Sequence, residues 1–156
     1  MEPSIPAALR SLASAGSALG ELAAWRRRAQ GDTRALVGEL RDNLLYLDMV
    51  AEEGVPLGDV IDKLSVGEYR RLSREGFNFD SLKRARIAAD PSLEGTELAP
   101  WAGKRTGELV ESIFDKLIEL KIRYPHVGTR SGYRWNVRVN NIRKRIWLLL
   151  KHVRGG

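Results

Sequence analysis

An apolar repeat near the carboxyl end restricts the fold of this chain more than any other feature. Apolar side chains recur there at alternating steps of four and three residues, at Trp135, Val139, Ile142, Ile146, Leu149 and Val153. Such steps place side chains on one face of an α-helix, whereas a strand needs a step of two. We therefore expect a helix over residues 134–153 with one buried face.

The first part of this segment also allows a strand. Tyr133, Trp135, Val137 and Val139 alternate with polar residues, and a strand here would belong to a hairpin like the wing of a winged-helix protein. The alternation covers seven residues and the helical repeat covers nineteen. The helix is therefore the favoured interpretation.

The remaining elements also read as helices. Longer helices are expected over residues 5–29, 33–53 and 106–123, with a break at Gly31 and Asp32. Shorter helices are expected over 57–64, over 66–75 behind a capping box of Ser65 and Glu68, and over 81–89 behind Asp80. The prediction is one all-α domain over 1–156, a single bundle of about four longer helices with two or three short helices between the second and third.

Composition excludes several kinds of chemistry. The chain has no cysteine, which excludes disulfides, thiol catalysis and cysteine-bound zinc. His126 and His152 are its two histidines, too few for a multi-histidine metal site. We expect no metal and no cofactor. The amino terminus lacks a basic signal region and no apolar run is long enough to span a membrane, so we expect a cytoplasmic protein.

Charge is distributed very unevenly. Residues 121–156 contain ten Lys or Arg and no Asp or Glu, whereas residues 1–120 contain 16 basic and 20 acidic residues. A segment at +10 beside a body at −4 indicates a polyanionic partner, namely nucleic acid, a protein with an acidic surface or an anionic membrane surface. The alternative is that the basic segment docks on the acidic body of its own chain.

The basic residues of this segment are the candidate contacts to a nucleic-acid backbone, DNA or RNA, without sequence specificity. They are Arg130, Arg134, Arg138, Arg143, Lys144, Arg145 and Lys151. A second cluster consists of Lys83, Arg84 and Arg86. Tyr133 and Trp135 could stack on unpaired bases, although the helical repeat favours a core position for Trp135.

Arg145 and His152 raise a catalytic alternative. Their spacing resembles the loosest Arg-x(4–6)-His pattern of the HEPN ribonucleases, in which the histidine would move a proton and the arginine would steady a phosphate. Ile146 stands where those enzymes usually carry a polar residue. We therefore treat Arg145 and His152 as a weak catalytic pair and expect no enzyme activity.

Two stretches, TGELVESIFDKLIELK and VRVNNIRKRIWLLLKH, resemble the carboxyl ends of small, uncharacterised helical proteins of bacterial defence loci. The resemblance implies a defence context and supports the helix over 134–153. The function expected overall is nucleic-acid binding by an accessory subunit or oligomer. The alternatives are a helical protein-interaction or oligomerisation module, and a membrane-surface role for residues 5–28.

Overall fold

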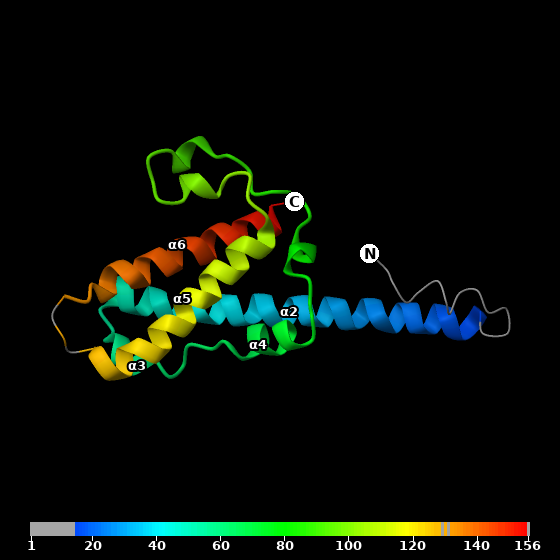
Figure 1. Ribbon diagram of the computed structural model, residues 1–156, viewed down its shortest axis with the longest axis horizontal. Coiled ribbons are helices and arrows are strands. Elements are labelled where there is room, and N and C mark those ends of the chain that lie inside the picture. Colours follow the sequence, from blue (N-terminus) through cyan, green and yellow to red (C-terminus); the bar gives the residue numbers. More distant parts are fainter. Residues whose placement is uncertain (1–14, 129, 131, 156) are drawn as a thin grey trace. The chain divides into compact units, whose positions relative to one another are not determined.

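The computed structural model describes residues 15–128, 130 and 132–155, and this part of the chain is all-α (Figure 1). It contains five α-helices, four of them of seven residues or more, together with three short 3-10 turns and no strand. The predicted fold class is therefore confirmed. None of the helices in the described ranges is both long and apolar enough to cross a membrane.

Helix α2 is the longest element and runs over Ala15–Glu53, a span of 39 residues. The break predicted at Gly31 and Asp32 is wrong, because both residues lie within this helix. One glycine and one aspartate cost an α-helix only about 1 kcal/mol each, and Arg28, Ala29 and Gln30 before them and Arg34 and Ala35 after them are strong helix formers. The end of α2 before Gly54, which has a φ of +73°, agrees with the prediction.

Contacts divide the chain into two units, residues 1–35 and 36–156, and each is described by itself. The described part of the first unit is a stretch of α2, on which Leu19 and Trp25 are 62% and 48% exposed. The earlier portion of the helix predicted over 5–29, residues 5–14, lies outside the described residues.

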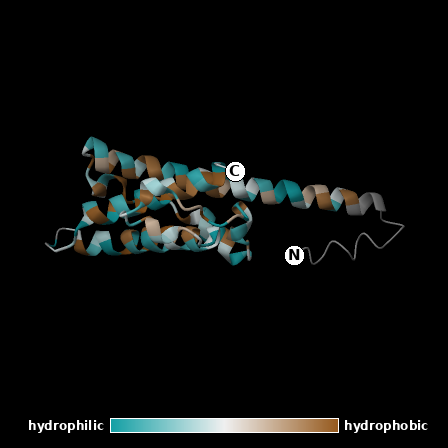
Figure 2. Ribbon diagram, turned by 90° about the horizontal axis from the view of Figure 1, so that it is seen from above, coloured by the Kyte–Doolittle hydropathy of each residue, from teal (hydrophilic) through white to brown (hydrophobic). Residues whose placement is uncertain are grey.

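In the second unit, α2 shares one apolar core with helices α5 (Thr106–Val127) and α6 (Trp135–Arg154). The fully buried members include Leu36, Leu40 and Leu47 from α2, Leu109, Ile113, Phe114 and Leu117 from α5, and Ile142, Ile146 and Leu149 from α6. Each helix carries both hydrophobic and hydrophilic residues (Figure 2), and the buried ones recur at the steps of three and four that an amphipathic helix requires. The helix predicted over 134–153 is confirmed, and the strand alternative is wrong.

Helix α5 begins at Thr106, as predicted, and ends later than predicted. At its start the Asp80 carboxylate accepts the backbone N–H of Gly107 at 2.8 Å. At the other end the helix continues past Tyr124 to Val127 with Pro125 in its last turn. Proline removes only one backbone donor there, so one more turn can form.

Two short helices follow α2, as predicted: α3 over Leu57–Val60 and α4 over Gly67–Arg74. The capping box predicted for Ser65 and Glu68 is wrong. Asn43 accepts the backbone N–H of Ser65 at 2.8 Å, and Glu39 accepts the backbone N–H of Glu68 at 2.9 Å. Both capping side chains come from α2, more than twenty positions away in the sequence.

The helix predicted over 81–89 is also wrong. A 3-10 turn, η2, covers Phe79–Leu82, and the chain then runs without helix to η3 (Pro91–Leu93) and η4 (Ala99–Trp101). Ile87 is buried, and its backbone pairs with the backbone of residues 103 and 104 at 2.8 and 3.0 Å. These long-range hydrogen bonds replace the local ones that a helix would need. We call residues 83–105 the connecting loop.

Candidate nucleic-acid interface

The basic residues of α6 fall on two flanks with different surroundings. Arg138 and Arg145 lie on one flank, with Arg134 just before the helix, whereas Arg143 lies on the other. Lys144 and Lys151 lie between the two flanks. The helical spacing of the sequence predicts these two flanks, and the structure shows which partners each basic residue has.

Arg143 is paired with acidic side chains of its own unit. Its Nε donates to Asp48 Oδ1 at 2.8 Å and one Nη to Glu52 Oε2 at 2.7 Å, both on α2. The guanidinium is 20% exposed, and these two hydrogen bonds raise its pKa against the opposing effect of burial. Arg143 therefore joins α6 to α2 and does not offer a free cation to a polyanion.

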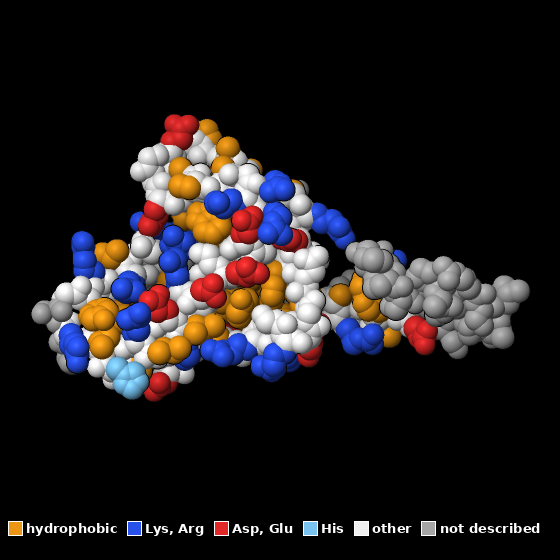
Figure 3. Space-filling view, in the orientation of Figure 1, with side chains coloured by type: hydrophobic (Ala, Val, Ile, Leu, Met, Phe, Trp, Pro, Cys, Tyr) orange, Lys and Arg blue, Asp and Glu red, His pale blue; other side chains and the backbone are white. Residues whose placement is uncertain are grey.

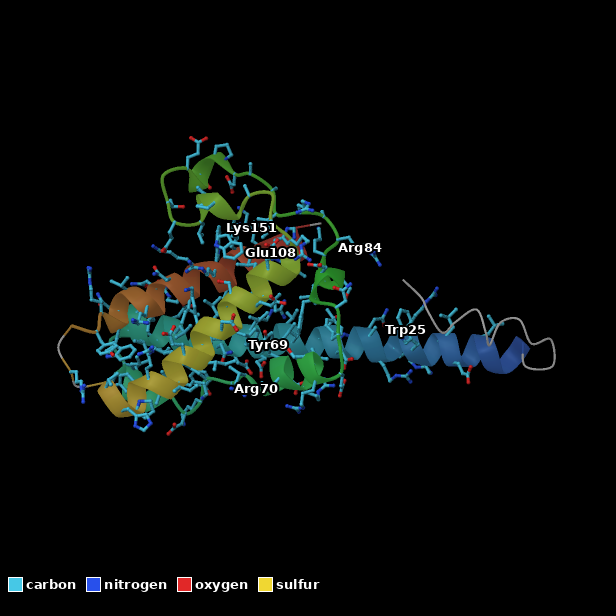
Figure 4. All side chains as sticks on the ribbon, viewed as in Figure 1. Trp25, Tyr69, Arg70, Arg84, Glu108 and Lys151 are labelled. Carbon is cyan, nitrogen blue, oxygen red and sulfur yellow. The ribbon has the colours of Figure 1, made fainter. Side chains whose placement is uncertain are left out.

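Lys144 and Lys151 are paired with the connecting loop. Lys144 Nζ lies 3.2 Å from Glu97 Oε1, and Lys151 Nζ lies 2.9 Å from Asp90 Oδ2. Figure 4 labels Lys151 on α6 beside this loop. Hydrogen bonds from Lys151 and then from Ser92 lower the pKa of Asp90 to about 2, so its carboxylate is ionised at neutral pH.

Two cations without such partners lie in a groove between α5 and α6. The groove has a volume of about 340 Å³, and its polar lining consists of Lys116, Glu119, Arg134, Arg138 and Asn141. Among the residues described, neither Lys116 nor Arg134 makes an ion pair, and both are exposed. We call this feature the α5–α6 groove.

Among the described residues that line the groove, Glu119 is the one carboxylate, and two arginines share it. Its Oε2 accepts from Arg123 Nε at 2.9 Å and lies 3.9 Å from an Nη of Arg138. The longer contact leaves the Arg138 guanidinium, which is 41% exposed, largely available. The groove lining therefore keeps an excess of positive charge.

Aromatic rings lie beside the same groove. The rings of Tyr133 and Trp135 are stacked with centroids 5.2 Å apart at 11°, and Tyr124 meets Trp135 edge-on at 5.3 Å. The Arg138 guanidinium carbon lies 5.7 Å from the centroid of each stacked ring. Trp135 packs against the core, as the helical repeat predicts, and Tyr133 is half-buried.

Arg145 and His152 have separate partners. Arg145 Nη1 donates to the carbonyl of Asn141 at 3.1 Å, and its Nε is buried without a hydrogen bond. His152 Nε2 lies 2.9 Å from the hydroxyl of Thr106, whose own hydrogen goes to the carbonyl of Lys83 at 2.7 Å. A hydroxyl that donates to Lys83 has its oxygen lone pairs left to accept, so this contact fits an imidazole Nε2–H donor.

Burial, and then the charge of Lys83, lower the pKa of His152, while a hydrogen bond to the Ala85 backbone acts in the opposite direction. The imidazole is thus held between α5 and the connecting loop.

The second basic cluster lies on the connecting loop rather than on α6. Arg84 is exposed (Figure 4), and Arg86 donates to the carbonyl of Gly103 at 3.0 Å. Lys83 is half-buried beside His152. Arg130 is exposed in the turn between α5 and α6. Figure 3 shows basic and acidic side chains interspersed over this face of the second unit, with no single continuous basic field.

Three charged side chains that line the groove or pair with the lysines of α6 are not predicted from the sequence. They are Lys116, Glu97 and Asp90. Lys116 is one of several charged residues on the outer side of α5, and no local signal marks it as facing Arg134 and Arg138. The two carboxylates come from a loop whose course depends on long-range hydrogen bonds.

Comparison of the chain with protein-family models, with curated protein sequences and with solved structures finds no match.

Proposed function

We propose that the second unit of this protein binds the sugar–phosphate backbone of nucleic acid in the α5–α6 groove. The observation that carries the proposal is the convergence of Lys116, Arg134 and Arg138 from two helices on one groove. Phosphate oxygens are bound well by guanidinium and ammonium donors arranged in this way. Lysine and arginine contacts to phosphate carry no sequence information, so we expect binding to many sequences.

The set of residues proposed to contact phosphate is smaller than the set expected from the sequence. Arg143, Lys144 and Lys151 already have carboxylate partners, and a phosphate would have to replace those partners at a cost. Lys116 and Arg134 face no such competition among the described residues. They are therefore the first contacts that we expect a polyanion to make.

The test is a fluorescence-anisotropy titration of a labelled oligonucleotide at several salt concentrations. For the double variant Lys116→Ala/Arg134→Ala, we expect weaker binding at low salt. The slope of log K against log salt should fall by about 1.5, because two phosphate contacts are lost. The variant should lose affinity equally for unrelated sequences.

The matched control is the double variant Arg70→Ala/Arg74→Ala. It removes the same charge from exposed positions on α4, and Arg70 is labelled in Figure 4. It should keep the affinity of the unaltered protein within about twofold, since net charge alone acts only through the screened field. Equal loss in both variants, or no salt dependence in the unaltered protein, would contradict the proposal.

A second candidate function is protein interaction through the first unit. Leu19 and Trp25 on α2 are 62% and 48% exposed, and burial of these side chains against a partner would remove apolar surface from water. Light scattering should then give a mass above that of one 17.5 kDa chain, and Trp25→Glu should reduce it. The role of accessory subunit and the bacterial-defence context remain predictions that accompany either function.

A further inference from the structure

We infer that the α5–α6 groove takes single-stranded nucleic acid and that one unpaired base stacks on the ring of Tyr133. This inference rests on the proposed function and names the class of nucleic acid. It combines two independent features of the described residues, a cationic groove and a fixed aromatic ring at its edge.

One face of the Tyr133 ring is fixed by the ring of Trp135. Trp135 lies parallel to it at 5.2 Å, and Trp135 is itself fixed by Tyr124 and by an Nε1–H donated to the carbonyl of Gly128 at 3.3 Å. Trp135 and Tyr124 also pack against the apolar core. A ring supported in this way loses little conformational entropy when a base stacks on it.

The ring is also placed directly beside the phosphate-binding cations. Tyr133 lies between Gly132 and Arg134, which both line the groove, and the Arg138 guanidinium lies 5.7 Å from the ring centroid. Gly132 has a φ of +99°, which favours glycine, and it adds no side chain next to the ring. One nucleotide can therefore place its phosphate on Arg134 and Arg138 and its base against Tyr133.

A cationic groove with an aromatic ring at its edge favours binding of single-stranded over double-stranded nucleic acid. In a double helix both faces of each base are covered by neighbouring base pairs, so an aromatic side chain has no base face to contact. In a single strand every base has an available π-face, and stacking tolerates any sequence. Stacking on Tyr133 therefore strengthens binding to the groove only for unpaired nucleotides.

The experiment compares three labelled ligands of equal charge on the full chain. They are a short oligothymidylate, the same backbone without bases, and a duplex with the same number of phosphates. We expect the oligothymidylate to bind about tenfold more tightly than the abasic strand, which corresponds to one stacked base. Tyr133→Ala should abolish that difference and leave the affinity for the abasic strand unchanged, whereas Tyr133→Phe should retain it.

The outcomes separate this inference from the proposed function. Absence of binding to all three ligands contradicts the proposed function. Equal binding of the oligothymidylate and the abasic strand by the unaltered protein contradicts the stacking inference alone, and this comparison does not depend on whether Tyr133→Ala folds. An unchanged preference for the oligothymidylate in a folded Tyr133→Ala protein likewise overturns the role of Tyr133.

Discussion

The carboxylate of Glu39 accepts the backbone N–H of Tyr69 at 3.0 Å, so a side chain of α2 caps the start of α4 thirty positions later. The same carboxylate accepts the N–H of Glu68 at 2.9 Å and the hydroxyl of Ser65 at 2.5 Å. Glu39 is only 6% exposed. Three donors at the start of α4 and its preceding turn thus depend on one buried carboxylate.

We expect Glu39→Ala to lower the free energy of unfolding by about 2–4 kcal/mol. Hydrogen bonds to a charged group contribute about 1.5–3 kcal/mol, and truncation leaves two backbone donors without a partner. Urea denaturation followed by circular dichroism measures the change. Asp42→Ala, an exposed carboxylate on the same helix, is the control and should change stability by less than about 0.5 kcal/mol. Equal effects of the two substitutions would contradict the role of Glu39.

Glu39 also shows where prediction from the sequence ends. The helices α5 and α6 and the end of α2 follow from apolar repeats and from Gly54, which are local signals. The cap of α4 does not, because its acceptors lie more than twenty positions away, and a local Ser65–Glu68 pattern suggests a different cap.

The candidate site shows the same limit. The sequence identifies Arg134, Arg138 and Tyr133, which occupy one short segment. It also identifies Arg143 as a nucleic-acid contact, because nothing local reveals that Asp48 and Glu52 on α2 lie opposite it. Charge counts establish that cations are in excess, and tertiary structure decides which of them are already neutralised.

The carboxylates of the connecting loop should compete with nucleic acid for α6. Asp90 binds Lys151, and Glu97 binds Lys144 and also accepts from the Asn141 amide at 2.7 Å when its nitrogen faces that carboxylate. Removal of both charges by Asp90→Asn/Glu97→Gln should release two lysines for phosphate contact. We expect affinity for an oligonucleotide to rise about threefold, with a steeper salt dependence, because exposed ion pairs are weak and two more cations become available for phosphate.

Anisotropy titration measures this change against a control of equal charge. The double variant Asp62→Asn/Glu94→Gln removes two exposed carboxylates that form no ion pair with any residue that the structure describes, one of them on the same loop. It should raise affinity by less than the Asp90 and Glu97 substitutions do. An equal increase in both variants would show that the effect comes from net charge and not from the pairing with Lys144 and Lys151.

His152 should make stability depend on pH in a narrow range. Its folded-state pKa is lowered from about 6.5, first by burial and then by Lys83, so the unfolded chain binds the proton more tightly than the folded chain. The corresponding stabilisation is therefore fully present above pH 6.5 and is lost as pH falls through the folded-state pKa. We expect the urea midpoint to decrease between pH 7 and pH 5.5.

The two histidines of the chain provide the control for this effect. His152→Gln removes the titrating group, so the decrease in the urea midpoint over that range should become smaller. His126→Gln, at an exposed position near the end of α5, should leave the decrease as it is in the unaltered protein. A decrease that is the same in His152→Gln and the unaltered protein would assign it to other groups.

Gly31 tests the continuity of α2 through the position where the sequence suggests a break. A Cβ built on Gly31 meets no atom within 4 Å, and the residue lies inside the helix. Gly31→Ala should therefore increase helicity at 222 nm and stabilise amides of residues 25–35 against hydrogen exchange by about 0.5–1 kcal/mol. Gly54→Ala is the opposite case, because its φ of +73° disfavours any side chain, and it should destabilise the end of α2 by about 1 kcal/mol. If α2 ended at Gly31 in a left-handed conformation, both Gly31→Ala and Gly54→Ala would destabilise the helix end at which they lie.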